Sequence, residues 1–337
     1  MRCSLISQST EGATSLLVAL MHRITLLTNP DKCNLNCPLC FLNQRSGVEC
    51  GERGGENREL DGCGFGEMPF DVARAAIEKY AAERDSLGNR VLREVIPSTM
   101  GEPLLYSHFE DLLSLCRSME LPLNLTTNGT FPRKWGREAG MAELLRVCSD
   151  IKVSYLASEQ FDGWKANVEK LLNVRKSLMV DAAQNGNAMR VGNVANSMLN
   201  ARVLDIATVS LQVTLHKKNV DKAAELVSWA SLIGIDRIKW NPVVLLSTAS
   251  QELREMYALD DKLLEILRNE LQTGALSAAN VKHEGSLFFN NGADICAVGG
   301  KCESCPFADE VWIWPDGHED HCPNPERRWG EQSSSTK

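Results

Sequence analysis

The stretch Cys33-Asn34-Leu35-Asn36-Cys37-Pro38-Leu39-Cys40 places three cysteines within eight residues. It follows an apolar, β-branched run at 22–28 that we predict to be the first strand. Neighbouring thiols this close would form strained disulfides, so the spacing favours a loop that turns three thiolates toward one metal site. Thiolates select zinc or iron–sulfur clusters, and four are the usual complement. Because only three are present, one position on the metal would be open to another ligand.

Apolar segments alternate with helical patterns along most of the chain. The predicted strands are 22–28, 93–97, 121–127, 151–156, 208–215 and 235–246, and the predicted helices begin at Pro69 or span 109–119, 139–148, 164–179 and 222–233. Strands that alternate with helices form parallel βαβ units with right-handed crossovers. Six such units fall short of the eight that close a barrel, so an α/β partial barrel is expected. The polar, glycine-rich stretches 45–67 and 182–200 are predicted to be surface loops.

The Cys-x3-Cys-x2-Cys spacing after a strand resembles the signature of the radical S-adenosylmethionine (SAM) enzymes. The resemblance implies a partial (β/α)6 TIM-like barrel and a four-iron, four-sulfur cluster on Cys33, Cys37 and Cys40. In that family the amino and carboxylate groups of SAM chelate the fourth iron. One electron then cleaves SAM to a 5′-deoxyadenosyl radical, which takes a hydrogen atom from the substrate. The alternative is a zinc loop whose fourth ligand lies elsewhere.

Other strand ends carry residues that match SAM-binding positions of the family. Gly101-Glu102-Pro103 resembles the Gly-Gly-Glu-Pro motif that receives the amino group of SAM, with Met100 in place of the first glycine. By the same resemblance, Asn128 and Ser154 are candidate SAM contacts. The alternative for each is an ordinary turn residue.

Several further residues are candidates for the substrate side of the site. His216 could face the substrate or bond a loop carbonyl, and Trp240 and Asn241 could line the floor. Cys50 and Cys63 are candidate hydrogen-donor thiols, with free thiols on a loop as the alternative. Cys116 and Cys148 are expected to be buried helix residues.

A second group of cysteines lies near the end of the chain, at Cys296, Cys302, Cys305 and Cys322. Pro315-Asp316-Gly317 between two strand-like runs predicts a turn that returns Cys322 toward the other three. Behind a radical SAM core this pattern resembles the SPASM/Twitch extension, which implies an auxiliary 4Fe-4S cluster on a small Cys-rich β-hairpin. Structural zinc is the alternative, and His318 and His321 could be extra ligands or surface residues.

Composition limits the class of protein. Hydrophobic residues make up 43% of the 337 residues, as in ordinary globular proteins, and the net charge of −8 argues against a nucleic-acid or anionic-membrane partner. Twelve cysteines in two groups plus single positions indicate metal ligation in a reducing compartment, so we expect a cytoplasmic protein. The expected divisions are a dispensable leader at 1–21, the barrel at 22–250, and a linker helix with the auxiliary domain at 251–337.

The sequence thus predicts a radical SAM oxidoreductase or maturase. It would draw electrons from a flavodoxin or ferredoxin type of donor and act on a peptide, as in maturation of ribosomal peptides, or on an aminocyclitol or sugar. A non-catalytic zinc-binding regulatory protein is the alternative from another class.

Overall fold

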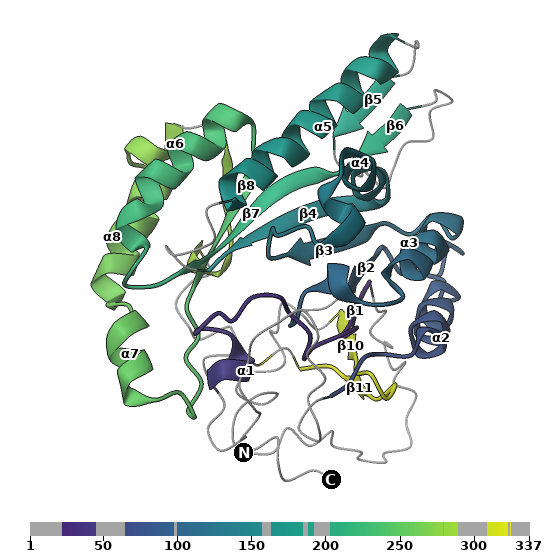
Figure 1. Ribbon diagram of the computed structural model, residues 1–337, viewed down its shortest axis with the longest axis horizontal. Coiled ribbons are helices and arrows are strands. Elements are labelled where there is room, and N and C mark those ends of the chain that lie inside the picture. Colours follow the sequence, from purple (N-terminus) through teal and green to yellow (C-terminus); the bar gives the residue numbers. More distant parts are fainter. Residues whose placement is uncertain are drawn as a thin grey trace.

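The computed structural model describes residues 22–44, 65–97, 100–156, 163–184, 188–191, 203–278, 280–288, 309–322 and 324. All six predicted strands are present in it. They are β1 Arg23–Leu26, β2 Glu94–Pro97, β3 Leu123–Thr127, β4 Cys148–Tyr155, β7 Thr208–Leu215 and β8 Arg237–Pro242. Each pairs in parallel with the next, so the predicted α/β sheet is confirmed (Figure 1).

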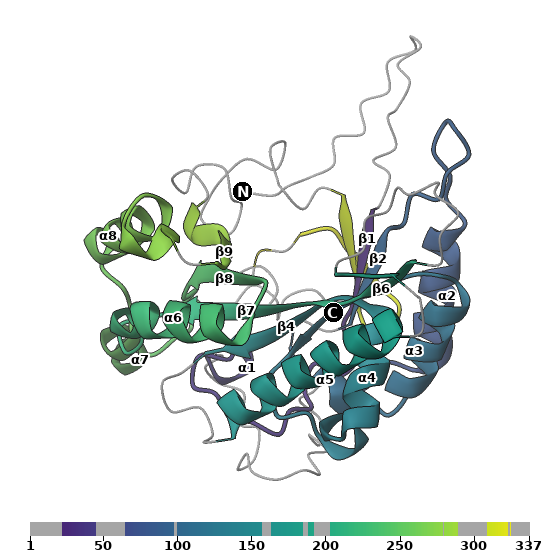
Figure 2. The ribbon, with the colours of Figure 1, turned by 90° about the horizontal axis from the view of Figure 1, so that it is seen from above.

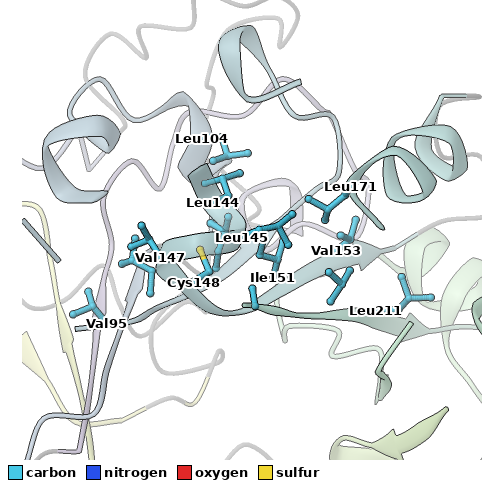
Figure 3. Close-up of a cluster of buried hydrophobic side chains, with 14 of the residues drawn as sticks. Val95, Leu104, Leu144, Leu145, Val147, Cys148, Ile151, Val153, Leu171 and Leu211 are labelled. Carbon is cyan, nitrogen blue, oxygen red and sulfur yellow. The ribbon is translucent and has the colours of Figure 1, made fainter. Parts of the chain in front are cut away.

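One face of this sheet is covered by helices. They are α2 Phe70–Ala81, α3 Phe109–Ser118, α4 Glu138–Val147, α5 Trp164–Gln184 and α6 Ala223–Ile233, and Figure 2 shows them in an arc along the curved sheet. Alternate strand residues such as Ile151, Val153 and Leu211 point into the core beneath the helices (Figure 3). Period-two alternation therefore leaves the remaining strand side chains on the opposite face.

That opposite face is polar. On β4 it carries Asp150 and Lys152, and β8 contributes Lys239, whose ammonium lies 3.7 Å from an Asp150 carboxylate oxygen. Closed TIM barrels instead fill this face with packed branched apolar side chains. The inner wall is thus suited to contact with a polar ligand.

The stretch predicted as a loop at 182–200 differs in part. α5 continues to Gln184, and β5 Ala188–Val191 pairs in parallel with β6 Val203–Ile206 in a separate small sheet. Pairing with a segment further along the chain stabilises β5 although its surroundings in sequence are polar. The loop prediction was wrong for these residues.

The C-terminal strands also differ from expectation. β10 Glu310–Ile313 and β11 Glu319–Asp320 pair antiparallel around Gly317, whose φ is +86°. We expected this pair in an appended extension, but β10 also pairs in parallel with β1. All four residues of β10 are buried, as is typical of a strand inside a sheet and not of an edge hairpin.

With these additions, the main sheet of the described chain has nine strands in the order β11-β10-β1-β2-β3-β4-β7-β8-β9, where β9 is Lys282–Glu284. Two further helices, α7 Gln251–Tyr257 and α8 Asp261–Gln272, are capped by the side chains of Ser250 and Asp260. Among the described helices none combines the length and apolar character needed to cross a membrane.

Short helical turns complete the described structure. They are α1 Phe41–Gln44 and the 3-10 helices Pro103–Leu105, Arg133–Gly136, Val220–Lys222, Ala275–Ala278 and Ser286–Phe288. Two of them, α1 and the turn at Pro103–Leu105, adjoin the candidate site.

Candidate metal and cofactor site

The three-cysteine loop begins beyond the carboxyl end of β1 and ends at α1. The Cys40 backbone N–H donates to the Cys37 carbonyl at 3.0 Å, and the Asn43 side-chain amide donates to the same carbonyl at 2.6 Å. These bonds fold the Cys37–Cys40 segment into a turn that leads directly into the helix. Active sites of parallel α/β barrels are built at this end of the strands.

The cysteine thiols of the loop affect one another's pKa. Burial, aided by the Coulomb effect of neighbouring thiols, raises the pKa of Cys33 to about 11 and the pKa of Cys37 to about 12. Free thiols here would be protonated at neutral pH, whereas a positively charged metal centre would hold them as thiolates. The donor set therefore fits an iron–sulfur cluster in its chemistry. Within the described ranges, no three His, Cys, Asp or Glu side chains are placed to hold a single metal ion.

Gly101 fixes the start of this loop against the end of β2. A Cβ at Gly101, where φ is +73°, would lie 2.1 Å from the Asn29 carbonyl oxygen and 2.8 Å from that of Lys32. The Glu102 N–H donates to the Lys32 carbonyl at 2.8 Å, and the Asn29 side chain donates to the Glu102 carbonyl at 2.7 Å. Only glycine permits this approach of two backbones.

The Glu102 carboxylate is fully buried and links the ends of β2 and β3. It accepts hydrogen bonds from the Thr127 hydroxyl at 2.8 Å, the Asn128 N–H at 2.7 Å and the Leu104 N–H at 3.2 Å. Burial raises its pKa to about 7, although these donors act in the opposite direction. Its oxygens are thus already bonded by the end of β3 and by the turn that follows β2.

Asn128, a candidate SAM contact, lies against the cysteine loop. Its side-chain amide nitrogen lies 3.6 Å from the Cys33 sulfur and donates to Asn34 at 2.9 Å. Its oxygen accepts from the Thr130 hydroxyl at 2.7 Å. Ser154 lies on β4, partly exposed, and its carbonyl accepts from the Trp164 indole at 3.1 Å.

Gln44 is a residue that sequence reasoning missed. This buried side chain donates to the Leu39 carbonyl at 2.9 Å and the Val244 carbonyl at 3.2 Å, and accepts from the Leu246 N–H at 2.8 Å. It therefore ties the cysteine loop to the segment after β8. The local sequence Phe41-Leu42-Asn43-Gln44 does not distinguish Gln44 from an ordinary polar residue at the end of a turn.

An apolar cluster lies beside Cys40. Its members are Leu27, Met100, Leu246, Trp312 and Trp314, with Cys40, Phe41 and Phe65 packed against it. Met100, which departs from the family motif, is therefore a packing residue. The cluster was not predicted because its members come from separate parts of the sequence.

The candidates for the substrate side of the site, His216, Trp240 and Asn241, make structural contacts. The buried His216 ring nitrogen contacts the Leu156 carbonyl at 2.5 Å, which confirms the loop-carbonyl alternative. Trp240 is fully buried and donates to His283 at 3.2 Å, so its placement on the site floor was wrong. The Asn241 side chain accepts two bonds from Ser286.

Three further cysteines, Cys116, Cys148 and Cys322, lie among the described residues. Cys116 is buried in α3 as expected. Cys148 is also buried, but it begins β4 and does not lie in a helix, and Figure 3 shows its sulfur among apolar side chains. Cys322 is partly buried and follows β11, whose Asp320 side chain accepts from the Cys322 N–H at 3.0 Å. The other predicted ligands and thiols, Cys50, Cys63, Cys296, Cys302 and Cys305, lie outside the described residues.

Comparison with known proteins supports the fold and leaves the sequence without a match. No protein-family model and no curated protein matches the chain. Structures of Streptococcus suis SuiB, among them one bound to S-adenosylmethionine, are similar with a TM-score of 0.55 and 13% identity over 90% of this chain. A third, bound to precursor peptide SuiA, has the same score over 93%. This chain spans 61% of the SuiB chain. The comparison shows that this chain shares its fold with SuiB.

Proposed function

We propose that this chain is a radical SAM enzyme. The observation that carries the proposal is the position of the Cys33/Cys37/Cys40 loop at the carboxyl end of β1, joined to β2 through Gly101 and to β3 through Asn128. A cluster held by these three thiolates would supply, with SAM and one electron from the donor protein, a 5′-deoxyadenosyl radical for removal of a hydrogen atom from the substrate.

The residues of this chain would hold and orient those groups. Cys33, Cys37 and Cys40 bind the cluster, and the Asn128 amide donates to one of its sulfur ligands, an interaction that tunes iron–sulfur potentials. Glu102 keeps the ends of β2 and β3 together. The Gly101-Glu102-Pro103 stretch would receive the amino group of SAM. Ser154 would contact SAM from β4. The apolar cluster at Trp312 and Trp314 keeps water from one side of the site.

The proposal includes an auxiliary 4Fe-4S cluster on Cys296, Cys302, Cys305 and Cys322. It would accept an electron from the substrate radical or anchor the substrate, and Cys50 or Cys63 would return hydrogen in an epimerisation. Among the substrate classes, a peptide draws support from the fold shared with SuiB, which was crystallised with its precursor peptide. A flavodoxin or ferredoxin type of protein would deliver the electron.

Anaerobic reconstitution tests this function. We expect about eight irons per chain, as two cubane clusters require, and 5′-deoxyadenosine from SAM when reductant is added. Cys33→Ala, Cys37→Ala or Cys40→Ala should abolish deoxyadenosine formation. Cys302→Ala with Cys305→Ala should remove about half of the iron. Cys116→Ala, at a buried core thiol, is the control and should keep the full iron content. Tight zinc binding without iron uptake would instead establish the zinc-binding alternative.

A further inference from the structure

Lys152 is a buried cation on the polar inner face of the sheet. Its residue is only 9% exposed. Lysine is almost never buried unless it is paired, because removing an ammonium from water is costly. Within the described part of the chain, its ammonium makes no hydrogen bond and no ion pair. A bound ligand with a negative charge would pair with the Lys152 ammonium and offset the cost of burying it.

The carboxylates that face Lys152 are engaged by other groups. Asp150 accepts from the Thr208 hydroxyl at 2.7 Å and the Ser210 hydroxyl at 2.6 Å through one oxygen. Its other oxygen lies 3.7 Å from the Lys239 ammonium. Among the described residues that second oxygen makes no hydrogen bond, so Asp150 is held by two hydroxyls and by the Lys239 ion pair.

The two other carboxylates in range have partners of their own. Glu94 on β2 accepts from Asn124 at 3.0 Å, and Glu310 on β10 accepts from Thr25 at 2.7 Å and lies 3.4 Å from the Arg23 guanidinium. Desolvation, followed by the Lys239 charge, lowers the pKa of Lys152 to about 8 in spite of these acids. Lys152 therefore remains mostly protonated at neutral pH.

The position of Lys152 suits a substrate that enters from the strand ends. It lies three residues before the end of β4, about 10 Å below that end at the usual rise of a strand. Gln212 and Thr214 on β7 are partly exposed on the same face, and their side chains make no hydrogen bond within the described residues. Polar groups available to a ligand thus line the wall above Lys152.

We propose that Lys152 binds a carboxylate of the substrate inside the barrel, with Lys239 as the second cation. This site would recognise a carboxylate on the substrate. It rests on the proposed function in one respect, which is that the reacting carbon lies at the strand ends. A substrate held in this way has its carboxylate about 10 Å from the group that reacts.

Binding can be measured without turnover on the reconstituted protein, with acetate as the probe and chloride at equal ionic strength as the reference. A ligand of the folded state raises the unfolding midpoint. We expect acetate to raise it by about 2 °C or more in the wild type and in Lys262→Gln, an exposed lysine on α8, and not in Lys152→Gln or Lys152→Met. An equal rise in all four proteins, or none in any, would overturn the proposal.

Trace acetylation of lysines with acetic anhydride, mapped by mass spectrometry, gives a second readout. Acetate should slow the acetylation of Lys152 at least fivefold relative to chloride, with little change at Lys262, and Lys239→Gln should reduce this protection. Equal rates at Lys152 in the two salts would contradict carboxylate binding.

The source of the carboxylate is resolved by comparing probes. A tripeptide that protects Lys152 with a free C-terminus but not as its amide indicates a peptide terminus, whereas protection by succinate alone indicates a small acid. Because SAM cleavage is scored separately, protection without cleavage refutes the proposed function and leaves the anion site intact. Cleavage without any protection refutes the anion site alone.

Discussion

Gly101 is the residue at which the cysteine loop and the end of β2 touch. Replacing it with alanine should combine two costs, since its φ is +73° and the added Cβ would meet the Asn29 carbonyl at 2.1 Å. Gly88→Ala is a matched control because Gly88 also has a positive φ, +81°, with nothing within 4 Å.

We expect Gly88→Ala to lower the free energy of unfolding by about 1 to 2 kcal/mol, the usual cost of a left-handed alanine. Gly101→Ala should lose at least about 2 kcal/mol more, because backbone must move, and should fail to retain iron. Denaturant unfolding and iron analysis measure both. Equal losses in the two variants would show that the loop does not depend on this contact.

The raised pKa of Glu102 predicts an unusual dependence of protein stability on pH. Its folded pKa of about 7 lies above the ordinary value, so the folded state binds the proton more tightly than the unfolded chain does. The stability from this group is fully present below the unfolded pKa and is lost as pH rises through about 7.

Glu102→Gln cannot titrate, so the comparison isolates this contribution. In the apoprotein the variant should be most destabilised relative to wild type near pH 5 and progressively less so toward pH 8. Urea unfolding at a series of pH values measures the difference. A difference that does not change with pH would contradict the raised pKa.

At the scale of elements, α1 is too short to be stable alone and depends on its tertiary bonds. Gln44 supplies them by joining the loop carbonyl of Leu39 to Val244 and Leu246. Gln44→Leu should leave buried backbone groups without partners, at about 1 to 3 kcal/mol.

The functional consequence should be faster loss of iron to a chelator, because the cysteine loop loses its link to the segment after β8. Gln251→Leu, at an exposed glutamine whose side chain donates to Glu255 of the same helix, is the control and should release iron at the wild-type rate. The two variants releasing iron at the same rate would argue against this role of Gln44.

The sequence predicted the elements that depend on local pattern. The β-branched runs gave all six core strands, and the spacing of Cys33, Cys37 and Cys40 placed the site at the end of the first of them. It did not predict β5, nor that β10 pairs with β1, because parallel pairing joins segments that are distant in sequence. Gln44 was missed for the same reason, since two of its partners, Val244 and Leu246, lie 200 and 202 residues away.

The role of a single candidate residue could be predicted only where the sequence left it one possible role. Cys116 and Cys148 were expected to be buried helix residues. Cys116 is one, whereas Cys148 is buried but is the first residue of β4. His216 and Trp240 each had a substrate-facing and a structural alternative, and their burial decided for the structural one. Strand period alone could not decide this, because it does not show which face of a strand meets the helices.

At the scale of the whole molecule, the sheet continues through β10 and does not stop at residue 250. The Leu27 N–H donates to the Ile313 carbonyl at 2.9 Å, and the His22 N–H donates to the Asp309 carbonyl at 2.9 Å. Removing β10 would expose the edge of β1, the strand that carries the cysteine loop. The C-terminal segment should therefore be required for folding as well as for any auxiliary cluster.

We expect a chain that ends at Phe288 to lack a cooperative thermal transition and to take up no iron, because the unpaired edge of β1 and the apolar residues that β10 covers would meet water. Lys79→Ala is the control. It breaks the exposed Lys79–Glu319 ion pair between α2 and β11 and the contact of the same ammonium with Tyr80, which should cost less than about 1 kcal/mol. Circular dichroism and iron analysis of the two proteins decide the matter. A shortened chain that melts cooperatively and binds a cluster would show instead that the barrel is complete without β10.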